Sequence, residues 1–232
     1  MVGLIGAMPV EMERMIACLE EKQEHRFGMD TFYSGRLYGV EAVLAVCGPG
    51  KVNAALCAQS MIFHFNPEWV LNLGTAGAGD NQQMGVGDMV IATGAWQHDM
   101  DTTGLGDPPC YVSKIGVIEF PCDQALREKL VAAAAQVPGL KVYQGPVATG
   151  DQFVNTQELK QKIRNLVRGV QAVEMEGAAV AHACYVNGTP CGIVRSISDG
   201  ADGNSDMDYA TFVGIAAEHS QQVVENLLKG MK

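Results

Sequence analysis

Apolar positions along the chain form short runs separated by amphipathic segments, a pattern typical of strands and helices that alternate in an α/β protein. Buried strands are predicted at residues 2–8, 69–77, 88–96 and 141–150, a hairpin at residues 31–47, and two more strands that end in the motifs AVEMEG and VRSISDGAD. Helices are predicted at residues 10–21, within 48–65, and at 123–136, 156–166, 177–186 and 208–229. We therefore expect one domain over residues 1–232, with a three-layer α/β/α architecture around a central mixed β-sheet.

The composition argues against several classes of function. The 232-residue chain has a formal net charge of −10 and no cluster of Lys or Arg, so nucleic acid, whose binding requires neutralised phosphates, is not expected as a partner. No segment approaches the roughly 18 apolar residues of a membrane span. The apolar start is short and soon acidic, unlike a signal peptide. Seven scattered cysteines without a CxxC pair indicate reduced thiols, and hence a cytoplasmic location.

Two acidic motifs end predicted strands within residues 172–202. The first carries Glu174 and Glu176, and the second carries Asp199. A helix lies between them, so the unit reads strand, helix, strand. In a parallel sheet this would bring acids from neighbouring strands to one carboxyl edge, where open α/β sheets bind ligands. Because buried acids are costly unless they are used, we interpret this edge as a catalytic site.

Other chemistries have weaker signals. GLIGAM and GTAGAG lack the spacing of a dinucleotide fingerprint and GPGK lacks that of a P-loop, so tight turns explain them better. The turn predicted at Gly74–Gly77 could still offer amides and a hydroxyl to a ligand. No second cluster with ligand spacing accompanies His98 and Asp99, so no metal is expected, and His182 fits a structural role. The absence of a GxSxG elbow argues against acyl transfer.

Acid–base chemistry by carboxylates remains. Glu11 follows the first strand, and Glu176 and Asp199 lie at the ends of later ones. Two carboxylates in different environments can divide into proton donor and acceptor, as in glycosidic-bond hydrolases. Each residue alone also fits a structural role: a solvated first-turn acid, a helix N-terminal acid and a turn former. Their placement at one sheet edge favours a site.

The motifs at these residues resemble those of the nucleoside phosphorylase-fold superfamily. They are IGAMPVEME, GPGKVNAAL, NLGTAGAG, the His98–Asp99 loop, ATGDQFV, AVEMEGAAVAH and VRSISDGAD, and they span nearly the full length. AVEME followed by RSISD is specific for the superfamily. IGAM with a glutamate three residues on is similar to the 5′-methylthioadenosine/S-adenosylhomocysteine nucleosidase family. The resemblance implies a nucleoside phosphorylase-like fold, no cofactor and no metal.

The resemblance also implies a role for each site residue. Asp199 would protonate N7 of adenine, with Ser198 orienting its carboxyl. Glu11 would position and deprotonate the attacking water, and Glu176 would hold the ribose hydroxyls. The remaining residues would pack or bind around the nucleoside: Met175 beside the sugar, Thr75 near sugar and water, Arg195 ordering the site, Phe153 and Val154 binding adenine, and Met8 and Tyr209 forming the 5′ pocket.

The same comparison favours water over phosphate as the nucleophile. Phosphorolysis needs cations, usually arginines, to hold phosphate. The superfamily's phosphorylases carry arginine after the first strand and again before the glycine-rich turn. This chain has Glu11 in the first segment and Asn72 and Leu73 before the second. An acid in a phosphate pocket would repel the nucleophile, so hydrolysis is expected.

Residues 97–117 lack periodicity and carry Gly, Pro and Asp, as long functional loops do. The resemblance implies a homodimer in which this loop lies near the partner's active site. Thr102 and Leu105 stand where relatives often carry an aliphatic residue and Phe, so recognition of the 5′ group is the least defined feature. The alternatives, in order, are a futalosine-type or other purine nucleosidase, a purine nucleoside phosphorylase, and a non-catalytic nucleoside-binding protein.

Overall fold

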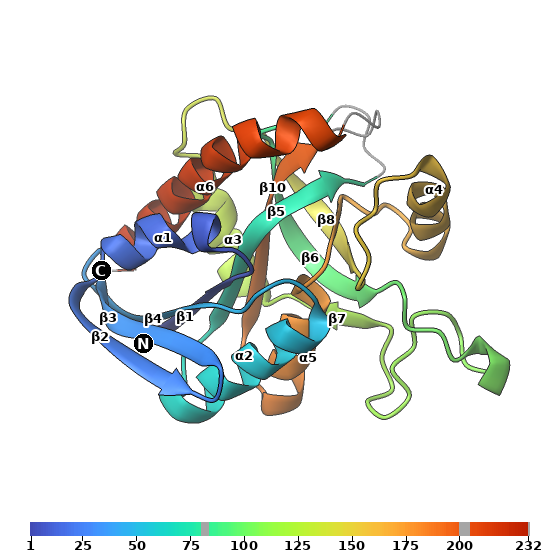
Figure 1. Ribbon diagram of the computed structural model, residues 1–232, viewed down its shortest axis with the longest axis horizontal. Helices are drawn as coiled ribbons and strands as arrows, with labels where there is room; N and C mark the ends of the chain where they lie inside the picture. The colour runs from blue at the N-terminus through green and yellow to red at the C-terminus, as the bar shows by residue number, and fades with distance from the viewer. Residues whose placement is uncertain (80–83, 200–204, 232) are drawn as a thin grey trace.

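A computed structural model describes residues 1–79, 84–199 and 205–231, with side chains for residues 1–79, 84–198 and 214–231. Strands and helices alternate along the chain (Figure 1). The strands are β1 (Val2–Gly6), β2 (Glu20–Phe27), β3 (Asp30–Leu37), β4 (Val40–Val46), β5 (Val70–Ala78), β6 (Met89–Gln97), β7 (Glu119–Pro121), β8 (Val142–Thr149), β9 (Ala172–Glu174) and β10 (Cys191–Asp199). The helices are α1 (Pro9–Ala17), α2 (Lys51–Phe65), α3 (Gln124–Ala134), α4 (Gln157–Leu166), α5 (Gly177–Asn187) and α6 (Ser205–Lys229), with a 3-10 turn, η1 (Thr103–Leu105).

The strands form one mixed sheet, as predicted. Its order is β10-β6-β8-β9-β5-β1-β4-β3-β2, with β7 beside β6 and an additional pairing between β10 and β5. Because β10 also pairs with β5, the strands β5, β10, β6, β8 and β9 form a closed, barrel-like circuit. Strands β1, β4, β3 and β2 extend the sheet from β5 and end at a free edge. β1 runs parallel to both β4 and β5, and its carboxyl end therefore lies at the same edge as theirs.

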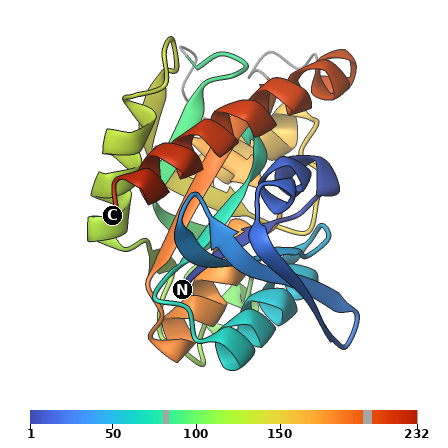
Figure 2. The ribbon, with the colours of Figure 1, turned by 90° about the vertical axis from the view of Figure 1, so that its left-hand side faces the viewer.

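Helices cover both faces of the sheet and give the predicted three layers (Figure 2). Successive side chains of β1 point to opposite faces of the sheet and pack against different helices. Leu4 packs in a core with α1, α3 and α6, whereas the next residue, Ile5, packs in a core with α2 and α5. Helix α4 covers a smaller cluster around Ile163 and Val170. None of the helices in the described ranges is long and apolar enough to cross a membrane.

The first helix is shorter than predicted. It ends at Ala17, and Glu20 and Glu21 belong to β2, a strand that sequence analysis missed. β2 lies at the edge of the sheet, its residues are mostly exposed, and it pairs with β3 alone. An edge strand held by backbone hydrogen bonds rather than by burial carries no apolar alternation, which is why its acidic sequence was read as the end of a helix.

The predicted turn at Gly74–Gly77 is wrong. These residues continue β5 as an extended strand that pairs with β10, with Gly74 opposite Arg195 and Thr75 opposite Ser196. Glycine is needed here for close approach rather than for a turn: a Cβ on Gly74 would lie 3.0 Å from Oε1 of Glu11. The strand therefore brings its backbone directly against an acidic side chain of α1.

The two acid-bearing strands are not hydrogen-bonded neighbours, contrary to the prediction. β9 pairs with β8 in parallel and with β5 in antiparallel orientation, and β10 pairs with β5 and β6. Both strands flank β5. Gly77 of β5 lies between them, paired with Val173 of β9 on one side and with Asp199 of β10 on the other.

Candidate active site

Glu11 is buried in the first turn of α1, facing β5. Its Oε2 accepts hydrogen bonds from the amides of Ala7 and Met8, both at 2.9 Å. Its Oε1 accepts from the amide of Thr75 at 2.9 Å and from the Thr75 hydroxyl at 3.3 Å. Three backbone N–H groups and a helix N-terminus thus stabilise the carboxylate. Glu11 is only 7% exposed, so it is not the solvated first-turn acid that the sequence alone would also allow.

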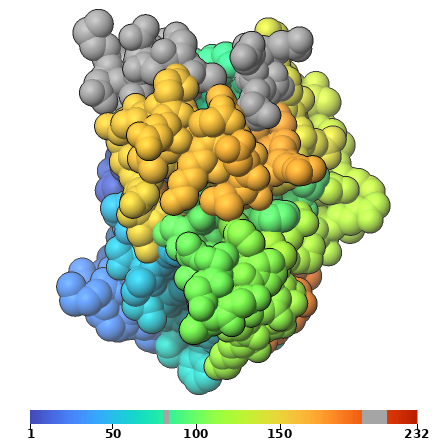
Figure 3. Space-filling model, turned by 90° about the vertical axis from the view of Figure 1, so that its right-hand side faces the viewer, coloured from blue at the N-terminus to red at the C-terminus, as the bar shows by residue number. Residues whose placement is uncertain are grey.

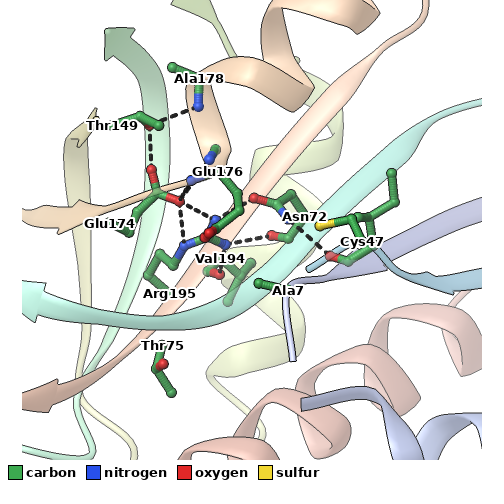
Figure 4. Close-up of polar contacts among 12 residues, drawn as sticks. Ala7, Cys47, Asn72, Thr75, Thr149, Glu174, Glu176, Ala178, Val194 and Arg195 are labelled. Carbon is green, nitrogen blue, oxygen red and sulfur yellow. Dashed lines mark hydrogen bonds and ion pairs between the residues drawn. The ribbon is translucent and has the colours of Figure 1, made fainter. Parts of the chain in front are cut away.

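Glu174 lies at the centre of a buried polar network (Figure 4). Its Oε2 accepts from the amides of Glu176 and Gly177, at 2.9 and 2.7 Å, and from the guanidinium of Arg195. Its Oε1 accepts from the hydroxyl of Thr149, which in turn accepts from the amide of Ala178 at 2.8 Å. These bonds join the ends of β8 and β9 to the start of α5. Both oxygens of Glu174 therefore hold these elements together.

Arg195 carries the network across the sheet to β1. Its Nη1 donates to the carbonyl oxygens of Val194 and Asn72, at 2.9 and 3.2 Å, and its Nη2 donates to the side-chain oxygen of Asn72. The amide nitrogen of Asn72 donates to the carbonyl of Ile5 at 3.0 Å. Arg195 is 1% exposed. Its guanidinium satisfies buried acceptors on three strands, β5, β9 and β10.

Glu176 precedes α5 and points toward the start of α2. Its Oε1 accepts from the amide of Gly50 at 2.9 Å. Burial, together with the negative charges of Glu174 and Glu11, raises the pKa of Glu176 to about 7, although Arg195 and the Gly50 amide oppose the shift. Two buried carboxylates with separate partners, Glu11 and Glu176, thus act on each other electrostatically at one edge of the sheet.

A pocket opens beside this polar network. Its lining includes three of the predicted binding residues, Phe153, Val154 and Met175, together with Glu174 and a buried lysine, Lys160. Phe153 is 59% exposed, so a flat apolar ligand could cover its ring. Phe153, Val154 and Met175, which are expected to contact the nucleoside, therefore line one pocket.

Three further predicted site residues, Ser198, Asp199 and Tyr209, lie close to or within the parts of the chain whose side chains are not described. Ser198 is buried on β10 and its hydroxyl donates to the carbonyl of Ala76 at 3.4 Å. Asp199 ends β10, opposite Gly77 of β5, but its side chain falls outside the described residues. The side chain of Tyr209, in α6, falls outside them as well.

Most cysteine side chains, and the ring of His182, are packed inside the described part of the chain. All seven cysteines are free and six are buried. His182 stacks on Phe120, with ring centroids 4.7 Å apart, and bonds to Gln97, which fits the predicted structural role. Within the described ranges, no group of three or more His, Cys, Asp or Glu side chains could hold a metal ion.

Sequence analysis missed several residues that build the site. Thr149 and Asn72 stand within the motifs ATGDQFV and NLGTAGAG, but nothing in the sequence indicates that their side chains bond to Glu174 and Arg195. Gly50 was interpreted as a turn residue, whereas its amide binds Glu176. Lys160 follows the polar pattern of an amphipathic helix but is 4% exposed. A signal existed for Gly50, because backbone N–H groups at a helix N-terminus commonly donate hydrogen bonds to acidic groups.

Comparison with known proteins places this geometry in context. A family model described as the phosphorylase superfamily matches residues 1–229. A 5′-methylthioadenosine/S-adenosylhomocysteine nucleosidase from a Marinomonas species is 36% identical over 229 residues, covering 99% of this chain and 98% of the relative. The crystal structure of such a nucleosidase from Neisseria meningitidis, in complex with methylthio-immucillin-A, has a TM-score of 0.93 at 37% identity, covering 99% and 98% of the two chains. One from Colwellia psychrerythraea, in complex with adenine, has a TM-score of 0.93 at 33% identity, covering 98% and 93%.

Proposed function

The chain belongs to the phosphorylase superfamily and, within it, to the 5′-methylthioadenosine/S-adenosylhomocysteine nucleosidases, and we propose that it hydrolyses the N-glycosidic bond of both compounds to release adenine and the 5′-thio-ribose. The observation that carries the proposal is the pair of buried carboxylates, Glu11 and Glu176, which act on each other electrostatically. Met175, next to Glu176 in the chain, lines a pocket together with the exposed Phe153. N-glycosidic cleavage builds positive charge on the ribose, which such carboxylates stabilise.

Glu11 is proposed to position and deprotonate the attacking water. Its carboxylate is held rigidly by the amides of Ala7, Met8 and Thr75, so it would present a fixed acceptor to a water molecule. Phosphate as nucleophile is disfavoured, because Glu11 would repel it. Arg195, the buried cation nearby, is engaged with Glu174.

Glu176 is proposed to bind the ribose hydroxyls. One of its oxygens bonds the Gly50 amide, and a carboxylate has further acceptor capacity for a diol. Met175 is adjacent and lines the pocket, so it would pack beside the sugar, while Phe153 and Val154 would take the base. Thr75, Met8 and Tyr209 are proposed to surround the sugar and its 5′ group.

Asp199 is proposed as the acid that protonates N7 of adenine, with Ser198 orienting it. This step supplies the departing base with a proton, so that the base leaves neutral. The backbone of Asp199 lies at the carboxyl end of β10, the same edge as the carboxylates. Arg195, three residues of strand away from Ser198, would keep that end of β10 fixed through its buried bonds.

The protein is also proposed to act as a homodimer in a reducing compartment such as the cytoplasm. Five large apolar side chains are exposed on α2 and α5, which lie beside each other and share side-chain hydrogen bonds. They are Val52, Leu56, Phe63, Tyr185 and Val186, here called the α2–α5 patch, with exposures of 45% to 79%. A patch of this kind typically marks a protein interface. The seven free thiols support the compartment.

One assay tests the reaction. The protein is incubated with methylthioadenosine, S-adenosylhomocysteine, adenosine, inosine and a futalosine-type nucleoside, with and without phosphate, and base release is followed. We expect adenine from the first two, independent of phosphate. Asp199→Asn should lose most turnover while retaining nucleoside binding. A strict phosphate requirement, a preference for inosine, or full turnover by Asp199→Asn would each contradict the proposal.

A further inference from the structure

Three segments that are distant in sequence meet at one carboxylate, Asp99. Its Oδ1 pairs with Nζ of Lys51 at 2.6 Å, and its Oδ2 accepts from the backbone amide of Asp151 at 2.9 Å. The Oδ1 of Asp151 in turn accepts from the backbone amide of Lys51 at 2.7 Å. Lys51, Asp99 and Asp151 are thus bonded pairwise and are here called the triangle. The loop after β6, the N-terminus of α2 and the segment after β8 are thus joined. This loop, green in Figure 3, lies on the same face as α4, in gold.

The triangle lies between the two halves of the proposed nucleoside site. Lys51 directly follows Gly50, whose amide binds the proposed ribose carboxylate Glu176. Asp151 lies two residues before Phe153, in the segment proposed to bind the base. A shift of Asp151 would therefore move the base segment relative to the ribose carboxylate, since both are anchored to the same helix end.

Packing around the triangle leaves little freedom. Gly50 has a φ of +96°, which favours glycine, and a Cβ there would lie 3.1 Å from the carboxylate of Asp151. Lys51 makes a second contact, to Oε1 of Gln97 at 3.3 Å. The amide of His98 is bonded to the carbonyl of Thr149 at 2.9 Å, so the loop stays paired with β8 just before Asp99.

The charges that face Asp99 favour its ionised form. Burial opposes ionisation, but the Lys51 ammonium and the Asp151 amide, together with His98, hold the pKa of Asp99 below its usual value. The side chains of Asp99 and Lys51 are 24% and 18% exposed, so the pair is screened only in part. Asp99 is therefore a charged carboxylate that accepts a hydrogen bond at each of its two oxygens, rather than a metal ligand or a surface acid.

We propose that Asp99 is a positioning residue that fixes the base-binding segment against the ribose-binding carboxylate through Asp151 and Lys51. This inference rests on the proposed function for the identity of the two subsites. It assigns a role to the His98–Asp99 and GPGK motifs, which the catalytic residues leave unexplained. Removing the triangle should weaken base binding and raise KM more than it lowers kcat, because the reacting carboxylates keep their own partners.

The test compares Asp99→Ala, Asp99→Asn and Lys51→Met with Asp101→Asn as the matched control. Asp101 lies in the same loop, but its bonds are local, to the amide and hydroxyl of Thr103. We measure adenine affinity by calorimetry, KM and kcat for methylthioadenosine, and amide hydrogen exchange of residues 150–154. Asp99→Ala should weaken adenine binding about tenfold and speed exchange, Asp99→Asn and Lys51→Met should do so about threefold, and Asp101→Asn should match the wild type.

The outcomes separate the inference from the function on which it rests. Wild-type affinity and exchange in Asp99→Ala would overturn the positioning role even if the enzyme is a nucleosidase. A wild type that releases no base would refute the proposed function, while exchange at residues 150–154 would still decide whether Asp99 fixes this segment. If Asp99→Ala does not fold, Lys51→Met decides, because it removes the ion pair and leaves the bond from Asp99 to Asp151. An unchanged Lys51→Met would then overturn the proposal.

Discussion

The backbone amide of Glu176 donates a hydrogen bond to Oε2 of Glu174 at 2.9 Å, so one acid of the AVEMEG motif holds the other in place. Their side chains face different partners. Glu174 is neutralised by Arg195, whereas Glu176 meets a single amide of Gly50. Glu176 therefore has a raised pKa and can accept further hydrogen bonds, whereas both oxygens of Glu174 are already bonded to neighbouring strands and to α5.

The raised pKa of Glu176 should make the protein less stable as the pH rises. Burial raises this pKa from 4.5 to about 7, so the unfolded chain ionises the group before the folded protein does. The free energy of unfolding is therefore unaffected by Glu176 below pH 4.5 and decreases as the pH rises from 4.5 to about 7. The difference corresponds to on the order of 3 kcal/mol at pH 8.

Glu176→Gln should remove this penalty. The glutamine keeps an oxygen to accept from Gly50 and cannot ionise, so the variant should be more stable than the wild type at pH 8 and similar at pH 4.5. Urea unfolding at several pH values measures this. The variant should also bind ribosides weakly while it binds adenine normally. A stability difference that does not change with pH would contradict the argument.

Glu11→Gln should abolish most turnover and leave binding largely intact. A neutral amide cannot deprotonate water, and loss of a general base typically lowers kcat about 10²- to 10⁴-fold. One end of the glutamine would also place an N–H group against the amides of Ala7 and Met8 or of Thr75. Single-turnover kinetics with methylthioadenosine, together with inhibitor binding, separate the two effects. Turnover within threefold of the wild type would exclude the proposed role of Glu11.

Thr149→Val should destabilise the protein and weaken nucleoside binding. The valine has nearly the same shape but leaves the buried Ala178 amide and one oxygen of Glu174 without their partner. An unsatisfied buried group typically costs about 1–3 kcal/mol. Thr149→Ser keeps the hydroxyl and should restore most of the stability and KM. Chemical unfolding and steady-state kinetics on both variants check this, and equal defects in the two would point to packing instead.

Sequence reasoning succeeded where signals are local and failed where partners come from other strands. Glu11 and Glu176 were found because acids near strand ends are unusual. The roles of Thr149 and Asn72 were not predicted, because they bond to Glu174 and Arg195 on other strands. The order of those strands in the sheet cannot be read from the sequence. Residues 74–77 were mistaken for a turn, since glycines that permit close approach to an acid look the same in sequence as glycines that permit a bend.

The α2–α5 patch gives the last prediction. If a second copy of the chain covers it, a charge at its most exposed residue should break the dimer, because an unpaired buried charge is costly in an interface. Phe63, at 79% exposure, lies in α2, so Phe63→Asp should sediment as a monomer while the wild type sediments as a dimer. Met29 is fully exposed but lies in the turn between β2 and β3, so Met29→Asp should leave the assembly unchanged. If the loop at residues 97–117 reaches the partner's site, Phe63→Asp should also lose activity on dilution. A wild type that is monomeric at micromolar concentration and fully active would refute the homodimer.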